Sequence, residues 1–138
     1  MIQRGFLVAV VGALLATPLA AQVKFSSTPI LQSGVTNAGG PITYPATDSA
    51  EVTALRVDIG PGGETGRHMH LSPAFVYVLE GAIEVEIEGG GSHSYKAGDS
   101  FVEAINLWHN GKNRGSIPVK LLVVFTGVRG KPNLVRPH

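Results

Sequence analysis

Two histidines stand close together in the sequence, with one residue between them: His68-Met69-His70. On an extended strand, side chains at positions i and i+2 share a face and lie about 6.6 Å apart along the chain. These two imidazoles can therefore converge on one metal ion. The chain contains no cysteine, which excludes disulfides, thiolate zinc sites and cysteine nucleophiles. Any metal must be held by histidine, carboxylate or amide groups.

The residues from position 51 onward form short apolar or alternating runs, separated by glycine, proline and asparagine. Residues 83–88, Ile-Glu-Val-Glu-Ile-Glu, show the two-residue period of a half-buried strand. Evenly spaced short strands with turn residues between them indicate a sandwich or a barrel, and no window shows the period of an amphipathic helix. The sequence predicts an all-β domain with strands at residues 52–59, 67–71, 74–79, 83–88, 93–96, 100–103, 108–110 and 119–128.

The histidines and the turn residues follow an order that resembles the cupin superfamily over residues 55–125. The residues that match its two short motifs are Gly62, His68, His70 and Gly81 in the first and Gly98, His109 and Asn113 in the second. The resemblance implies a single-domain double-stranded β-helix, the cupin or jelly-roll barrel. It also implies that His68, His70 and His109 hold one divalent transition metal, which is Fe, Mn, Zn, Ni or Cu. A barrel that keeps these histidines without a metal is the alternative.

The chain departs from the cupin motifs at three positions. Ala74 stands where the first motif has its glutamate, and a methyl group can neither coordinate a metal nor exchange a proton. Ala104 and Asn106 replace a proline and a glycine of the second motif. Asn106 can still make the turn, because asparagine tolerates the left-handed region of backbone conformation. The usual set of three histidines and one glutamate is thus reduced to three histidines, unless a carboxylate reaches in from elsewhere.

Glu103 is the carboxylate best placed to supply the missing ligand. It ends the strand that leads to His109 and lies in an otherwise apolar stretch, and a buried carboxylate needs a partner such as a metal. We expect Glu103 either to face inward, as fourth ligand or catalytic proton acceptor, or to point outward at the barrel rim. Glu80 is nearer to His70 in sequence, but it lies in a hairpin turn, where solvent is its expected neighbour.

The alternation along residues 74–79 predicts two faces of one strand. If Ala74 faces the histidines, Val76 and Val78 face the same way. The opposite face is formed by Phe75, Tyr77 and Leu79. This second face is too apolar for water, so we expect the N-terminal arm or a second subunit of a homodimer to cover it.

Length and charge limit the classes of partner. A chain of 138 residues with a net charge of +1 suits one domain, and without a basic stripe it is not expected to bind nucleic acid. Residues 1–21 have the layout of a secretory signal peptide: Arg4, an eleven-residue apolar run and small residues at the cleavage point. That run is shorter than the roughly 20 residues that span a bilayer. We expect an exported protein, periplasmic or secreted, with no stable membrane span after cleavage.

The expected organisation after the signal peptide is an N-terminal arm at residues 22–50, a barrel at 51–130 and a C-terminal tail at 131–138. Three neutral imidazoles leave coordination positions open, as catalytic metal sites do. The resemblance implies several chemistries, of which we favour dioxygenation of an enolate, diketone or flavonoid-like substrate. A cupin isomerase or lyase, and a non-catalytic module that binds a small molecule or a metal, are the alternatives. Arg67 either holds an anionic substrate or is an exposed strand residue.

Overall fold

The computed structural model describes residues 25–137, in which the regular elements are strands and no helix occurs. The described part of the chain accordingly holds no helix that could cross a membrane. The predicted signal peptide, residues 1–21, lies outside the described residues. The strands are β1 (Ala50–Ile59), β2 (Ala74–Glu80), β3 (Ala82–Ile87), β4 (Gly91–Lys96), β5 (Ser100–Val102), β6 (His109–Lys112) and β7 (Val119–Val128).

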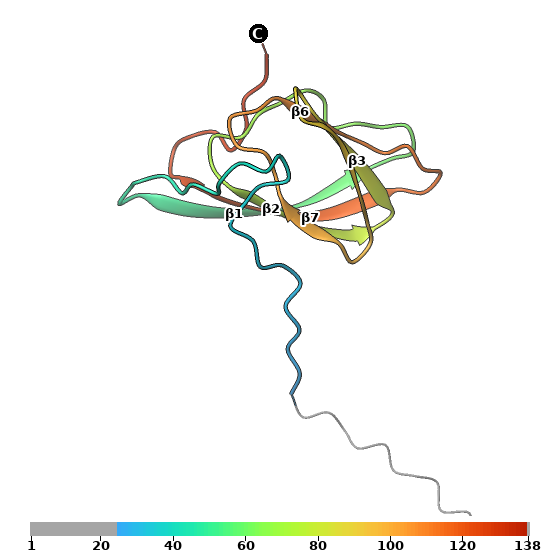
Figure 1. Cartoon of the computed structure of the whole chain (residues 1–138), viewed down its shortest axis with the longest axis horizontal. Coiled ribbons are helices and arrows are strands. Elements are labelled where there is room, and N and C mark those ends of the chain that lie inside the picture. The colour runs from blue at the N-terminus through green and yellow to red at the C-terminus, as the bar shows by residue number, and fades with distance from the viewer. Residues whose placement is uncertain (1–24, 138) are drawn as a thin grey trace, which may run out of the picture.

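The strands form two antiparallel sheets. One sheet has the order β1-β7-β2-β5, and the other has the order β4-β3-β6. Figure 1 shows β1, β2 and β7 side by side, with β3 and β6 on the other side of the barrel. The predicted all-β jelly-roll fold is confirmed.

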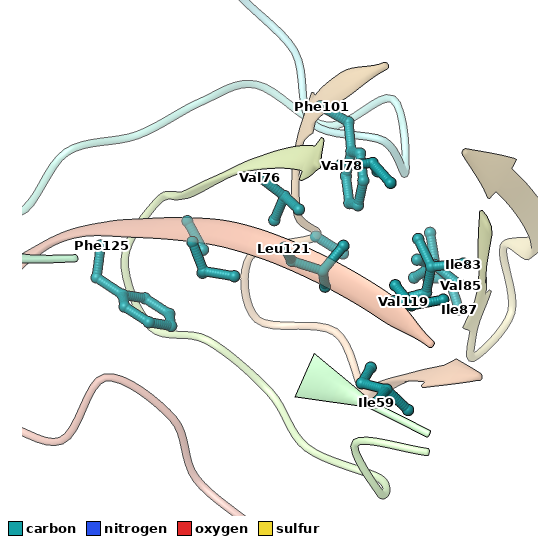
Figure 2. Packing of buried hydrophobic residues seen from close by; sticks show 13 residues of the cluster. Ile59, Val76, Val78, Ile83, Val85, Ile87, Phe101, Val119, Leu121 and Phe125 are labelled. Atoms are coloured by element: carbon teal, nitrogen blue, oxygen red, sulfur yellow. The ribbon is translucent and has the colours of Figure 1, made fainter. Parts of the chain in front are cut away.

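The core lies between the two sheets and follows the two-residue period of the strands. Residues of β7 alternate between buried and less buried positions from end to end, as a strand with one face on a core must. Figure 2 shows Ile83 and Val85 of β3 directed toward Val119 and Leu121 of β7. The buried cluster consists of Ile59, Ala74, Val76, Val78, Ile83, Val85, Ile87, Phe101, Ala104, Val119, Leu121, Val123 and Phe125.

The segment at residues 67–71, predicted as a strand, is extended but forms no continuous ladder. Its residues make isolated bridges to three different segments: His68 to His109, Met69 to Val135 and His70 to Ile105. The predicted alternation of inward and outward side chains is nevertheless present, since His68 and His70 are both buried while Met69 between them is half-buried. No single neighbour runs alongside for long enough to make a sheet.

Two residues in the left-handed conformation shape the turns around the site. Asn106 has a φ of 58°, as predicted for the asparagine that replaces a glycine, and its N–H donates to the carbonyl of His70 at 2.9 Å. Gly81 has a φ of 75° between β2 and β3. A Cβ at Gly81 would lie 2.6 Å from the carbonyl oxygen of Pro118, so this turn requires glycine for space as well as conformation.

The N-terminal arm runs beside β5, the edge strand of the larger sheet. The N–H of Asn37 donates to the carbonyl of Val102 at 2.7 Å. The predicted outward face of β2 is only partly covered: Phe75 and Tyr77 are half-buried, while Leu79 keeps 47% of its surface exposed.

Candidate metal centre

The three histidines of the predicted site come from two segments that pair with each other. His68 and His109 are direct antiparallel partners, each donating its N–H to the carbonyl of the other at 2.9 Å. Direct partners in an antiparallel pair project their side chains to the same face. His70 lies two residues beyond His68 and therefore shares that face as well.

The imidazole rings meet inside the barrel. The ring centroids are 4.4 Å apart for His68 and His109, 4.9 Å for His68 and His70, and 5.0 Å for His70 and His109. All three side chains are buried. One ligand atom from each histidine and one from Glu103 lie within 4.8 Å of one another. The structure thus brings together all four residues that the sequence singled out.

Backbone carbonyls fix which nitrogen of each ring faces the cluster. Each Nδ1 lies against a carbonyl oxygen: His68 on Gly66 at 2.7 Å, His70 on Asn133 at 2.8 Å and His109 on Leu107 at 2.9 Å. A carbonyl can only accept, so each Nδ1 must carry the hydrogen. In a neutral ring the Nε2 atom is then left with a free lone pair, which is the arrangement found for metal-ligating histidines.

Glu103 faces inward, which decides between the two orientations left open by the sequence. Its N–H donates to the carbonyl of Ala74 at 2.9 Å, extending the β2–β5 pairing in which Phe75 faces Val102 and Val76 faces Phe101. The side chain of Glu103 is 14% exposed, and its Oε2 lies 2.9 Å from the Nε2 of His70. Oε1 lies 3.8 Å from the Nε2 of His109. The carboxylate therefore completes a ring of four donor groups.

The charge states of the four residues reflect burial and the Glu103 carboxylate. Burial lowers the pKa of His68 and of His109 below the ordinary value for histidine, despite the nearby negative charge. Burial would also lower the pKa of His70, but the adjacent carboxylate raises it above the ordinary value. Burial would raise the pKa of Glu103, whereas His70 above all, then His109 and His68, lower it. Glu103 is thus ionised and attracts a positive charge to the cluster.

These donor groups suit a divalent transition metal. Among the described residues, the Nε2 atoms of His70 and His109 are buried without a hydrogen-bond partner, although Oε2 of Glu103 comes within 2.9 Å of the former. A buried polar atom without a partner is costly, and a cation between these atoms would satisfy them together. Imidazole nitrogens and one carboxylate suit Zn, Fe, Mn, Ni and Cu alike. The residues present fit a metal ion, and they do not select one.

A model of the cupin domain family matches residues 55–125, about half of the chain. This chain belongs to the cupin family. Germin-like protein subfamily 2 member 1 of Arabidopsis thaliana is 33% identical over 89 residues, which cover 61% of this chain and 41% of the relative. Germin-like protein 1-1 of Oryza sativa subsp. japonica is 30% identical over 88 residues, covering 60% and 41%. This cupin spans about two fifths of the length of these relatives.

Solved structures share the fold of this cupin. The DMSP lyase DddQ of Ruegeria pomeroyi has a TM-score of 0.54 and 25% identity, covering 70% of this chain and 46% of the lyase. The oxalate decarboxylase of Lactobacillus farciminis has a TM-score of 0.53 and 21% identity, covering 68% of this chain and 33% of the decarboxylase. At 21% identity, the similarity to the oxalate decarboxylase shows a shared fold alone.

The structure assigns other residues of the sequence to structural roles. Arg67 donates to Glu88 at 2.5 Å and lies over the ring of Trp108, 4.3 Å from its centroid, so its guanidinium is already engaged. Asn113, a cupin motif residue, is 2% exposed. Its side chain donates to the carbonyls of Ile59 and Ile117 and accepts from the N–H of Gly115.

Sequence reasoning missed the contribution of the C-terminal segment to the site. The carbonyl of Asn133 orients His70, and Val135 exchanges backbone hydrogen bonds with Met69. The Nη1 of Arg136 donates to the carbonyl of Thr65 at 3.1 Å. Two of these three contacts involve only backbone groups of the tail, so no motif marks them. Arg136 is the one side chain whose type could have drawn notice.

Proposed function

We propose that this cupin is a metalloprotein that holds one divalent transition-metal ion, Fe, Mn, Zn, Ni or Cu, on His68, His70, His109 and Glu103. The observation that carries the proposal is the set of inward Nε2 atoms, each fixed from behind by a carbonyl on Nδ1, with an ionised carboxylate beside them. Four protein ligands still leave positions open on a metal that accepts five or six, which is what a substrate needs.

The reaction we propose first is dioxygenation of an enolate, diketone or flavonoid-like small molecule. A bound metal supplies Lewis acidity and, if redox-active, the one-electron chemistry that dioxygen requires. The chain supplies a pocket with mostly apolar walls beside the cluster and the Glu103 carboxylate as ligand or proton acceptor. Although burial would raise the pKa of Glu103, the adjacent His70 above all lowers it, so the carboxylate is ionised and can accept a proton from a bound acid.

A lyase is the second candidate, favoured by the likeness to the DMSP lyase DddQ, which is 25% identical with a TM-score of 0.54. A lyase needs the same carboxylate as proton acceptor but no oxygen. The two reactions are therefore separated by whether turnover continues under anaerobic conditions. A cupin isomerase would likewise turn over without consuming oxygen.

The test uses protein purified without a histidine tag, loaded in turn with Fe(II), Mn(II), Ni(II), Cu(II) and Zn(II). Oxygen uptake is recorded with panels of diketones and flavonols. We expect one ion per chain and uptake with at least one redox-active metal, lost in Glu103→Gln and kept in Glu51→Gln, whose carboxylate is exposed on β1. Bound metal with no turnover, but with thermal upshifts for some ligand, would indicate a non-catalytic binding module instead. Failure to bind any of these metals would overturn the proposal.

We also propose that the protein is exported, to the periplasm or outside the cell, and that residues 1–21 are removed. The basis is the sequence pattern of these residues. Cell fractionation with N-terminal sequencing of the mature chain tests it. We expect the mature protein to begin at Gln22 and to leave the cytoplasm. A cytoplasmic protein that keeps Met1 would contradict it.

We further propose that the outer face of the larger sheet is a homodimer interface. Two rows of side chains cross this face: Ala54, Val124 and Phe75 in one, and Arg56, Leu122 and Tyr77 in the other. Both rows end on β5, at Val102 and Ser100, where the N-terminal arm already packs. Leu122 is 37% exposed and Leu79 is 47% exposed. Sedimentation at tens of micromolar should show a dimer that Leu122→Lys converts to monomer. A wild-type monomer at this concentration would contradict the proposal.

A further inference from the structure

A cavity of about 220 Å³ lies directly beside the four-residue cluster, and His68, His70 and Glu103 form part of its wall. This is smaller than the roughly 300–1,000 Å³ of sites for drug-sized ligands, so of the substrates proposed above a small enolate or diketone fits the cavity better than a flavonoid does. Most of the remaining wall is apolar. The apolar side chains are Leu55, Val57, Ile83, Leu121, Val123, Phe125 and Leu134.

Arg136 is the cationic side chain in this wall. It is brought there by the C-terminal segment, in which the neighbouring Val135 is bound to Met69 through both backbone groups. The Nη1 of Arg136 donates to the carbonyl of Thr65 at 3.1 Å. A Cβ at the adjacent Gly66 would lie 2.9 Å from this same Nη1. The guanidinium thus packs closely against the backbone of Gly66.

Most hydrogen-bond donors of the Arg136 guanidinium are not used by the described protein groups. Arginine carries five N–H donors, and the protein contact formed here is the single one to Thr65. Within residues 25–137, Arg136 forms no ion pair, in contrast to Arg67 with Glu88 and Arg114 with Glu84 and Glu86. A guanidinium with free N–H donors can bind a carboxylate through two parallel hydrogen bonds.

The charge of the cavity favours an anion. The carboxylate of Glu103 and the guanidinium of Arg136 cancel each other, and the histidines are neutral ligands. A divalent cation on the cluster therefore leaves the cavity with net positive charge. Arg136 itself is exposed at the mouth of the cavity, whereas the Glu103 side chain at the cluster is only 14% exposed. Charge at this buried end is screened less by water, so a negatively charged ligand is attracted more strongly than its neutral counterpart.

We propose that this cavity binds a small organic carboxylate with an apolar body, and that Arg136 pairs with the carboxylate group while the apolar wall holds the body. The inference rests on the proposed metal function, because it places the ligand beside the metal cluster. Arg136 is then the residue that determines specificity for acids over neutral analogues.

Benzoate and its neutral analogue benzamide are suitable probes, since they differ mainly in charge. Binding is measured by calorimetry to the full chain loaded with Zn(II). We expect benzoate to bind and Arg136→Gln to weaken it at least about tenfold, the loss of a charge-assisted pair, with Arg136→Lys between the two. Benzamide should bind weakly to all three proteins. Arg114→Gln, which removes the same charge outside the cavity, should bind benzoate as the wild type does.

Equal benzoate affinity in Arg136→Gln and the wild type, or equal affinity for benzamide and benzoate, would overturn the inference. So would a wild type that does not bind benzoate. The Zn(II) affinity of each variant is measured in parallel. A wild type that binds no Zn(II) contradicts the proposed metal function, whereas unchanged Zn(II) binding with no effect of Arg136 on benzoate contradicts this inference alone.

Discussion

Glu103 lies opposite Ala74 on the neighbouring chain segment, and its N–H donates to the Ala74 carbonyl at 2.9 Å. The two residues continue the register in which Phe75 faces Val102, so their side chains leave the sheet on the same face about 5 Å apart. Ala74 is the position at which the cupin motif has a glutamate. The carboxylate is thus present in this protein, displaced by one strand, and the small side chain at position 74 leaves room for it.

Exchanging the two residues tests this relationship. Glu103→Ala alone should weaken metal binding at least about tenfold, because a charged ligand is lost. Adding Ala74→Glu should restore much of the affinity, since a glutamate at position 74 starts from the same face of the same pair. Competition titration with a chelating dye measures the affinities, and a thermal melt shows that each variant is folded. A folded double variant no better than Glu103→Ala would contradict the exchange.

Removing one histidine separates metal binding from folding. In His70→Ala we expect metal binding to be lost while the barrel stays folded, because the buried cluster consists of aliphatic residues and phenylalanines from both sheets. The wild type should gain about 2.7 kcal/mol in the free energy of unfolding when the free metal is 100 times its Kd, and the variant should gain nothing. Chemical denaturation with and without metal measures both. Unfolding of the metal-free wild type would show that the metal is structural.

Truncation tests the role of the C-terminal segment. A chain that ends at Gly130 keeps all of β7 but loses the Asn133 carbonyl that orients His70. We expect metal affinity to fall about 10- to 100-fold, as for the loss of other groups that orient ligands, while the circular dichroism of the barrel is unchanged. A chain that lacks only residues 137–138 is the control and should bind metal normally. Normal affinity in the longer truncation would mean that His70 is held by other contacts.

Asn113 should matter for stability and not for metal binding. Asn113→Ala removes three hydrogen bonds of a buried side chain, including those to the Ile59 and Ile117 carbonyls, and should cost about 2–3 kcal/mol in the free energy of unfolding. Urea denaturation measures this, with Asn110→Ala as a less buried control that should lose less. A variant of Asn113 with normal stability and reduced metal affinity would instead place this residue in the function of the site.

The sequence predicted the barrel and the histidine cluster because both depend on short-range patterns. The alternation in β2 and β3 and the spacing of the histidines survive in the structure unchanged. The orientation of Glu103 was not predictable, because it lies one residue beyond β5, where the pairing with Ala74 decides its direction. The pairing of Arg67 with Glu88 and the approach of Arg136 to Thr65 could not be predicted from the sequence either. Both are contacts between segments far apart in the chain, and no local sequence pattern indicates them.

The most direct test of the metal centre is a crystal structure of the metal-loaded protein, with the ion located by its anomalous scattering. We predict one ion about 2.0–2.2 Å from the Nε2 atoms of His68, His70 and His109 and from a carboxylate oxygen of Glu103. An ion bound elsewhere, or one that His109 does not ligate, would contradict it.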